Sequence, residues 1–140
     1  MKLQKNTLYA LYGILDSASR PDEQMSTGEI AKTYGVSPHH LAKVLRALVR
    51  AGLVESVRGV GGGYRFAGNA RRLTLLDVIE LFERVGAGDH GVPARRRGRR
   101  AEVERALGTV FSEIDEISRA TLRSVTIATM LKLIERQRRS

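Results

Sequence analysis

The residues best suited to chemistry gather in a glycine-rich stretch, SVRGVGGGYRF, at residues 56–66. Glycine clusters of this kind occur in the phosphate-binding loops of enzymes and at the tips of hairpins that contact DNA. A dinucleotide-binding loop needs the spacing G-x-G-x-x-G before a helix, and Tyr64 stands where its last glycine belongs. The phosphate-loop pattern also fails, because no Lys-Ser or Lys-Thr pair follows any of these glycines. The stretch therefore favours a hairpin over a nucleotide-binding site.

A hairpin with a glycine tip can approach the sugar-phosphate backbone of DNA closely. Arg58 at its rim is suited to the minor groove, where narrow A·T-rich tracts concentrate negative potential. Arg65 on the returning strand is suited to neutralising a phosphate. The predicted DNA contacts of the hairpin are Arg58, Gly59, Gly61, Gly62 and Arg65. A plain hairpin with merely solvated arginines is the alternative.

A second group of polar residues lies on a predicted helix that follows Ser37. With Leu41, Val44, Leu45 and Leu48 facing inwards, its outer face carries His39, His40, Ala42, Lys43 and Arg46. The first residues of the second helix in a helix-turn-helix meet base edges in the major groove. We therefore predict base contacts from His39, His40 and Lys43, and a phosphate contact from Arg46.

Two further features concern the same region. Backbone N–H groups at helix starts bind phosphate, and Thr27 and Ser37 are predicted to assist there. The adjacent histidines also suggest a metal site. Neighbouring residues on a helix point about 100° apart, so His39 and His40 are not expected to share one ion.

The elements that position these residues have clear local signals. Ser26 and Glu29 form a predicted capping box that opens a short helix, which stops at Gly35. Ser37 and Pro38 open the second helix, and Gly52 ends it. Residues 54–57 and 63–66 are predicted strands on either side of the glycine tip. A helix-turn-helix followed at once by a β-hairpin is a winged helix.

The flanking segments are also predicted to be helical. Asn6 is the expected cap of a first helix whose apolar face is Leu8, Leu11, Tyr12 and Leu15. Thr74 and Asp77 cap a later helix. From about residue 101 a long helix carries a narrow apolar seam, which suits a partner helix, made of Val103, Leu107, Val110, Ile114 and Ile117. A break near Val125 and a cap at Thr126 precede the last helix.

Composition limits the classes of function. The 140 residues carry a net charge of +9 and 42% hydrophobic residues, so a folded chain with a polyanionic partner is expected. The chain has no cysteine, which excludes disulfides, thiolate metal sites and cysteine nucleophiles. No apolar run approaches a membrane span, and the apolar start is interpreted as a first helix rather than a signal peptide. We expect a cytoplasmic protein that is not an enzyme, has no cofactor or metal, and does not contact a membrane.

Residues 29–80, EIAKTYGVSPHHLAKVLRALVRAGLVESVRGVGGGYRFAGNARRLTLLDVIE, closely resemble the Rrf-two family of bacterial winged helix-turn-helix transcription regulators, which includes IscR, NsrR and CymR. The opening MKL…YAL and the closing TLRSVTIATML are also similar to family sequences. The resemblance implies a homodimer that binds an operator in double-stranded DNA, with the long helix crossing its symmetry mate. It places His39, His40 and Lys43 in the base-contacting stretch and Arg58 at the minor-groove arginine of the wing. Ala42 replaces a residue that is often acidic in IscR-like members, so the preferred DNA sequence is expected to differ.

The predicted fold is thus mainly α: a winged helix-turn-helix with a two-stranded β wing and a long C-terminal dimerisation helix. We divide the chain into a DNA-binding domain at 1–85, a basic loop at 86–100 and dimerisation helices at 101–140. Iron–sulfur members carry three cysteines in the loop, whereas this loop reads GAGDHGVPARRRGRR and cannot hold a thiolate-ligated cluster. Asp89 and His90 alone make a poor metal site.

The function predicted from these features is a transcription regulator, repressing rather than activating, that responds to a small-molecule effector or a regulatory protein. The alternative is a winged-helix adaptor that binds proteins without specific DNA binding. The arginines of the run 95–100 contact DNA phosphates or an acidic partner, or they belong to a solvated loop.

Overall fold

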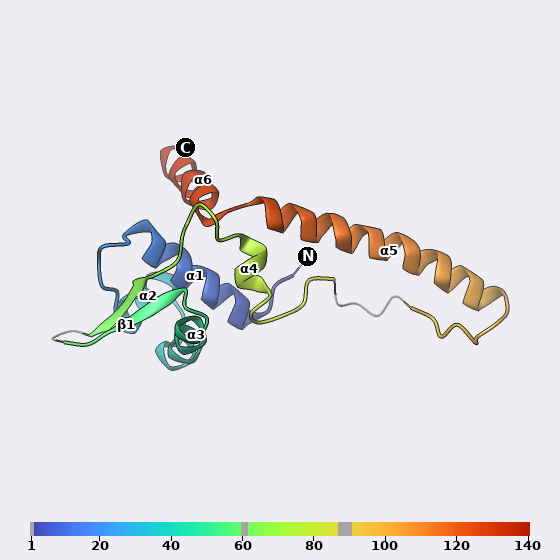
Figure 1. The fold of residues 1–140 in the computed structure, drawn as a ribbon, viewed down its shortest axis with the longest axis horizontal. Coiled ribbons are helices and arrows are strands. Elements are labelled where there is room, and N and C mark those ends of the chain that lie inside the picture. Colours follow the sequence, from blue (N-terminus) through green and yellow to red (C-terminus); the bar gives the residue numbers. More distant parts are fainter. Residues whose placement is uncertain (1, 60–61, 87–90) are drawn as a thin grey trace.

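The computed structural model describes residues 2–59, 62–86 and 91–140. Within these ranges the chain forms six helices and two strands, and is mainly helical, as predicted. Figure 1 shows α1 to α4, α6 and the hairpin gathered at one end, while α5 projects away from them. In chain order the elements are α1 (Lys5–Ser19), α2 (Thr27–Tyr34), α3 (Pro38–Arg50), β1 (Val54–Val57), β2 (Gly63–Phe66), α4 (Leu75–Ile79), α5 (Arg99–Ser124) and α6 (Ile127–Arg139).

The first helix, α1, is the centre of the core, but two details predicted for it were wrong. Its N-cap is Gln4, without a side-chain cap, because the helix already includes Asn6. Its buried face consists mainly of small residues, whereas Leu8 is 36% exposed. The buried residues of α1 are Thr7, Ala10, Leu11, Gly13, Ile14, Ser17 and Ala18. Small side chains allow neighbouring helices to approach closely, as Gly13 does for Leu45 of α3.

The helix-turn-helix, α2 and α3, follows the predicted local signals. The Ser26 hydroxyl accepts a hydrogen bond from the N–H of Glu29 at 3.0 Å and so caps α2. Gly35 ends α2 with φ 65°, a left-handed conformation that glycine adopts without strain. Leu41, Val44, Leu45 and Leu48 form the buried face of α3, as predicted.

The hairpin is antiparallel and pairs Val54 with Phe66 and Val57 with Gly63, so both strands have their predicted bounds. The other edge of β2 pairs with a single residue, Met25. The N–H groups of Met25 and Tyr64 each donate to the carbonyl of the other at 2.8 Å. A segment just before α2 thus anchors β2 to the helix-turn-helix near the wing tip.

The junction between α5 and α6 returns the chain to the core. The Thr126 hydroxyl accepts from the N–H of Thr129 at 3.1 Å and caps α6, as predicted. The Leu75 N–H donates to the Val125 carbonyl at 2.9 Å, and the Ile127 N–H donates to the Leu73 carbonyl at 2.8 Å. Ile127 is fully buried, so α6 packs into the same core as α1.

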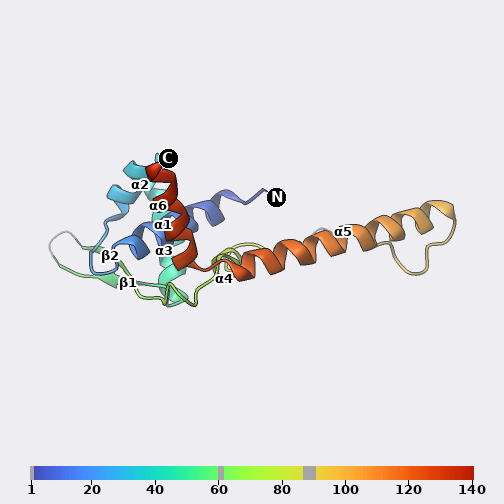
Figure 2. The same cartoon turned by 90° about the horizontal axis from the view of Figure 1, so that it is seen from above.

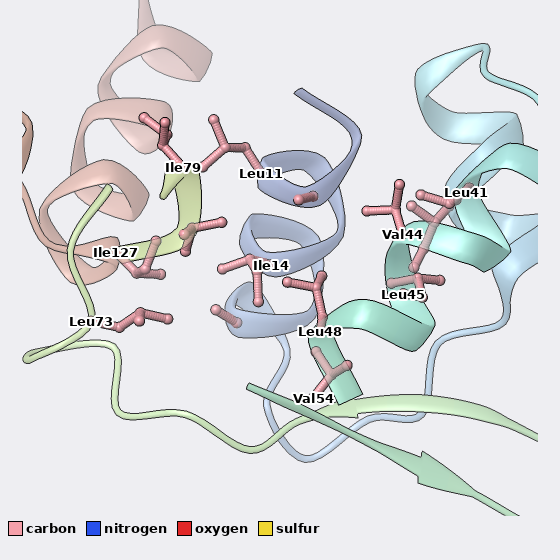
Figure 3. Packing of buried hydrophobic residues seen from close by; sticks show 14 of the residues in the cluster. Leu11, Ile14, Leu41, Val44, Leu45, Leu48, Val54, Leu73, Ile79 and Ile127 are labelled. Carbon is pink, nitrogen blue, oxygen red and sulfur yellow. The ribbon is translucent and has the colours of Figure 1, made fainter. Parts of the chain in front are cut away.

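Figure 3 shows the core from close by: α1 lies between α3 residues such as Leu41 and Leu45 on one side and Ile79 and Ile127 on the other. Most of α5 contributes nothing to this core. Within the described ranges, no helix is long and apolar enough to cross a membrane.

Candidate nucleic-acid interface

The start of α3 presents the predicted base-contacting stretch. Ser37 is the N-cap, and its hydroxyl accepts a hydrogen bond from the N–H of His40 at 3.3 Å. His39, Lys43 and Arg46 are exposed, because Leu41, Val44 and Leu45 turn the opposite face of the helix into the core. These three side chains therefore share an accessible face of α3.

His40 has a different environment from its neighbour. It is half-buried, and its Nε2 forms a hydrogen bond with Oδ1 of Asn6 in α1. Its ring also meets the ring of Tyr9 edge to face, with centroids 5.2 Å apart and planes at 74°. The structure thus connects His40 to α1, a partner that the spacing of the sequence did not predict.

Two hydroxyl residues were predicted to assist phosphate binding at helix starts. Thr27 is half-buried in the first turn of α2, next to the capping Ser26. Ser37 is exposed, but its hydroxyl oxygen already accepts the N–H of His40. Both residues are at the N-terminal ends of their helices, where the positive end of the helix dipole favours anions.

The wing carries two arginines in unlike settings. Arg65 faces Glu55 across the hairpin, and its Nη2 lies 2.6 Å from the Glu55 Oε1, forming an ion pair. Arg58 directly follows β1 and is exposed. Of these two arginines, Arg58 is therefore the one that the described strand register does not place opposite a carboxylate.

The backbone of the wing tip depends on glycine. Gly59 is exposed and has φ 131°, and Gly62 is exposed with its N–H donating to the Gly59 carbonyl at 2.9 Å. The predicted contact Gly61 lies outside the described residues. Figures 1 and 2 show the wing at the opposite end of the molecule from the free end of α5.

The basic run lies at that far end. Arg99 and Arg100 belong to the first turn of α5 rather than to a loop. They pair with Glu102 at 3.7 Å and with Glu104 at 2.9 Å. Arg105 donates from Nη1 to the carbonyl of Arg96 at 2.9 Å, which ties the preceding segment to the helix.

A cavity of about 440 Å³ lies between that segment and α5. Its lining consists of Gly91, Val92, Arg105, Gly108, Thr109 and Ser112. Asp89 and His90, the weak metal ligands considered above, lie outside the described residues. Among the described residues, no three His, Asp or Glu side chains are grouped so that they could hold a metal ion.

The sequence did not predict several contacts that position the candidate interface. Met25 pairs with the wing, and Glu83, just after α4, accepts hydrogen bonds from the N–H of Gln4 and the hydroxyl of Thr7. Arg119 of α5 makes two hydrogen bonds to the Glu80 carboxylate: Nη1 donates to Oε2 at 3.0 Å, and Nη2 donates to Oε1 at 3.3 Å. The Glu55–Arg65 pair had a signal, since the predicted hairpin register places these residues opposite each other. The others join residues far apart in the sequence.

Solved structures share this architecture. The structure of CymR, the global cysteine regulator of B. subtilis, matches with a TM-score of 0.79 at 24% identity, covering 95% of this chain and 98% of that one. IscR of T. potens matches with a TM-score of 0.78 at 26% identity, covering 98% of this chain and 90% of that one. Both likenesses extend over nearly the whole of this chain and show that it shares the fold of these proteins.

Comparison of sequences finds a relative with a higher identity than these solved structures have. A relative from Rhodopseudomonas palustris, named as a candidate HTH-type transcriptional regulator, BadM, is 53% identical over 146 residues, which cover 99% of this chain and 86% of that protein. The sequence model of the Rrf2 (Rrf-two) family, described as "Iron-dependent Transcriptional regulator", matches residues 3–133. The predicted resemblance is thereby confirmed, and the class of function is that of a regulator rather than an enzyme. The chain belongs to the Rrf2 family of winged-helix transcription regulators.

Proposed function

We propose that this regulator is a homodimer that binds a specific, pseudo-palindromic operator in double-stranded DNA and represses transcription in the cytoplasm. The observation that carries the proposal is the placement of three exposed residues, His39, Lys43 and Arg46, on the outer face of α3, on a scaffold that also bears an exposed wing arginine, Arg58. A major-groove helix and a minor-groove arm are the two contacts that a winged helix offers to a duplex.

Each residue has a distinct role in this proposal. His39 and Lys43 contact base edges, and Arg46 binds a phosphate. Arg58 enters the minor groove, and the glycines of the tip let the backbone approach the sugar-phosphate chain. The helix starts at Thr27 and Ser37 add backbone N–H contacts to phosphates. Arg65 contributes less, because Glu55 already compensates its charge.

Dimerisation is supported by the exposed seam on α5. Val103, Leu107, Val110, Ile114 and Ile117 are each between 43% and 62% exposed. A row of large apolar side chains on a helix that leaves the core calls for a partner surface. A second copy of the chain would cover it and present two recognition helices, with half-site centres about one helical turn of DNA apart or a multiple of it.

We propose that the regulator senses its signal without a cysteine-ligated iron–sulfur cluster. The family description refers to iron. The chain has no cysteine, and the described residues contain no alternative group of ligands, so the residues present do not fit an iron–sulfur cluster. Regulation by a small-molecule effector or a regulatory protein fits this chain better.

The test is selection of bound fragments from random DNA with the purified protein, followed by gel shifts at physiological salt. The proposal expects a two-fold symmetric sequence that binds much more tightly than unrelated duplexes. The rival is a winged-helix adaptor that binds proteins. Equal binding of all duplexes at low salt, with none at physiological salt, would favour that adaptor, because such binding is electrostatic and independent of sequence.

A further inference from the structure

The two adjacent histidines of α3 differ in how they contact the rest of the molecule. His39 is exposed, whereas His40 is half-buried against α1. The rings of His40 and Tyr9 pack edge to face, and the His40 Nε2 is hydrogen-bonded to the Asn6 Oδ1. Since a carbonyl-type oxygen only accepts, Nε2 is the donor of this bond. The Nε2 of His40 is therefore already bonded within the protein, whereas the ring of His39 is exposed and accessible to a ligand.

The residue that receives this hydrogen bond is itself held in place. Asn6 lies in the first turn of α1, between Gln4 and Thr7. The Gln4 N–H donates to the Glu83 Oε2 at 2.9 Å, and the Thr7 hydroxyl donates to the same oxygen. Thr7 is also fully buried. The turn that carries Asn6 is thus a fixed point, not a loose terminus.

The rest of the contact between α1 and α3 is apolar. Leu45 and Leu48 of α3 lie beside Gly13 of α1, and the missing side chain of Gly13 lets Leu45 approach closely. Apolar packing is not directional, so by itself it leaves a helix some freedom to slide or turn. A hydrogen bond is directional. The bond from His40 lies in the first turn of α3, where a small rotation would displace His39 and Lys43 most.

We propose that His40 is a positioning residue: its contacts with Asn6 and Tyr9 fix the N-terminal end of the recognition helix on α1, so that His39 and Lys43 meet the bases. This assignment rests on the proposed function, because it concerns how the operator is contacted. It departs from the sequence-based prediction, in which both histidines contact bases.

The experiment compares five variants on the selected operator and on a panel of operators with single base-pair changes. His40→Ala removes both contacts of the ring. His40→Gln keeps a side-chain donor close to the position of Nε2. Asn6→Ala removes the acceptor and leaves α3 untouched. The double variant of Asn6→Ala with His40→Ala completes a cycle, and His39→Ala is the matched control. Circular dichroism at the assay temperature checks that each protein is folded.

We expect His40→Ala and Asn6→Ala each to weaken operator binding by roughly three- to tenfold, by a similar factor on every operator of the panel. The double variant should be little weaker than either single variant, because both remove the same contact. His40→Gln should restore most of the affinity. His39→Ala should instead relax the preference at one base pair in each half-site.

Three results would overturn the assignment. The first is a loss of preference at one base pair in His40→Ala. The second is independent, multiplicative effects of Asn6→Ala and His40→Ala. The third is wild-type affinity in Asn6→Ala. If the wild-type protein itself prefers no sequence, the proposed function fails first, and the assignment of His40 fails with it. A failure confined to the variants leaves the proposed function intact.

Discussion

The two arginines of the wing differ in charge compensation. Arg65 forms a cross-strand ion pair with Glu55, with distances of 2.8 Å from Nε and 2.6 Å from Nη2. Binding a phosphate with Arg65 would require this pair to loosen or to share its donors. Arg58 is exposed at the end of β1, beside the glycine tip. Of the two, Arg58 is the side chain expected to enter a minor groove.

We predict that Arg58→Ala weakens specific binding by about 1–3 kcal/mol, the size of one good groove contact. Fluorescence anisotropy with a labelled operator at fixed salt measures the loss. The control is the double variant Glu55→Gln with Arg65→Gln, which removes a neutral pair and should bind nearly as tightly as the wild type. Unchanged affinity in Arg58→Ala would remove this arginine from the interface.

Tyr34 joins α2 to α1 through its ring and its hydroxyl. The ring stacks on Tyr12, with centroids 4.6 Å apart, and the hydroxyl donates to the Asp16 Oδ1 at 3.1 Å. Burial, followed by the negative charge of Asp16 and this hydrogen bond, raises the pKa of Tyr34 from 10.0 to about 12. The neutral phenol is thus favoured in the folded protein.

This shift predicts a pH dependence of stability. A group whose pKa is higher in the folded state contributes its full stabilisation below the unfolded pKa and loses it as the pH rises through the folded value. The window is therefore pH 10 to about 12. We expect the free energy of unfolding of the wild type to fall across this window more steeply than that of Tyr34→Phe.

Urea unfolding followed by circular dichroism at a series of pH values measures the difference. At pH 8, Tyr34→Phe should be less stable than the wild type by about 0.5–1.5 kcal/mol, because one hydrogen bond is lost. Tyr12→Phe, which keeps the stacked ring, should retain most of the wild-type slope, because Tyr12 is the last of the causes that raise the pKa of Tyr34. Parallel pH curves for the wild type and Tyr34→Phe would contradict the prediction.

At the scale of the elements, the sequence best predicted the helix starts and ends, which depend on the chemistry of neighbouring residues. Backbone N–H groups in the first turns are capped by the side chains of Ser26, Ser37, Thr74 and Thr126, and the left-handed Gly35 ends α2. The buried face of α1 was predicted only in part, because tertiary packing decides it: Leu11 is buried and Leu15 packs against the core, but Leu8 is exposed. This helix is enclosed on two sides, so small residues such as Ala10 and Gly13 are buried, while the bulkier Leu8 lies outside.

The candidate site likewise combines features that could be predicted from the sequence with one that could not. The exposed positions of His39, Lys43 and Arg46 on α3 could be predicted, since the apolar face of the helix determines its outer face. The contact between His40 and Asn6 joins residues 34 positions apart. The packing of α1 on α3, which brings them together, follows from the whole fold and not from the spacing of either segment.

The attachment of β2 near the wing tip depends on the absence of a side chain at Gly63. A Cβ at this position would lie 2.3 Å from the carbonyl oxygen of Met25, which is a backbone atom and cannot move aside easily. Gly63→Ala should therefore break the bridge between Met25 and Tyr64 and displace the wing. We expect a loss of about 1–3 kcal/mol in the free energy of unfolding, as for other overpacked sites, together with weaker operator binding.

Thermal unfolding and anisotropy with the operator measure both effects. Gly28→Ala is the matched control: it is exposed in α2, and its Cβ would meet only the Ser26 Oγ at 4.0 Å. Alanine has the higher helix propensity, so this variant should be as stable as the wild type or more stable. A Gly63→Ala protein with wild-type stability would show that the bridge is not needed to hold the wing.

At the scale of the whole molecule, the contacts among the described residues hold α5 to the core toward its C-terminal end. Near its C-terminal end, Arg119 pairs with Glu80 and the α5–α6 junction is bonded to residues around α4. Further along, the helix extends away from the core (Figures 1 and 2). Its apolar seam of Val103, Leu107, Val110, Ile114 and Ile117 is exposed over this length. The proposed dimer would take this seam out of water, where a single chain leaves it exposed.

We therefore predict that Ile114→Glu, at the middle of the seam, converts a dimer into a monomer. Placing an unpaired carboxylate in an apolar interface costs about 3 kcal/mol or more, which corresponds to roughly a hundredfold rise in the dimer dissociation constant.

Sedimentation velocity over a range of concentrations measures the shift in this dissociation constant. Ser112→Glu adds the same charge at an exposed position on the opposite face of α5 and should remain dimeric. Because two half-sites are contacted together only by a dimer, Ile114→Glu should also lose most of its preference for the symmetric operator while keeping its binding to a single half-site. A wild-type protein that sediments as a monomer at every concentration, or an Ile114→Glu variant that sediments as the wild type does, would contradict the assignment of the seam to dimerisation.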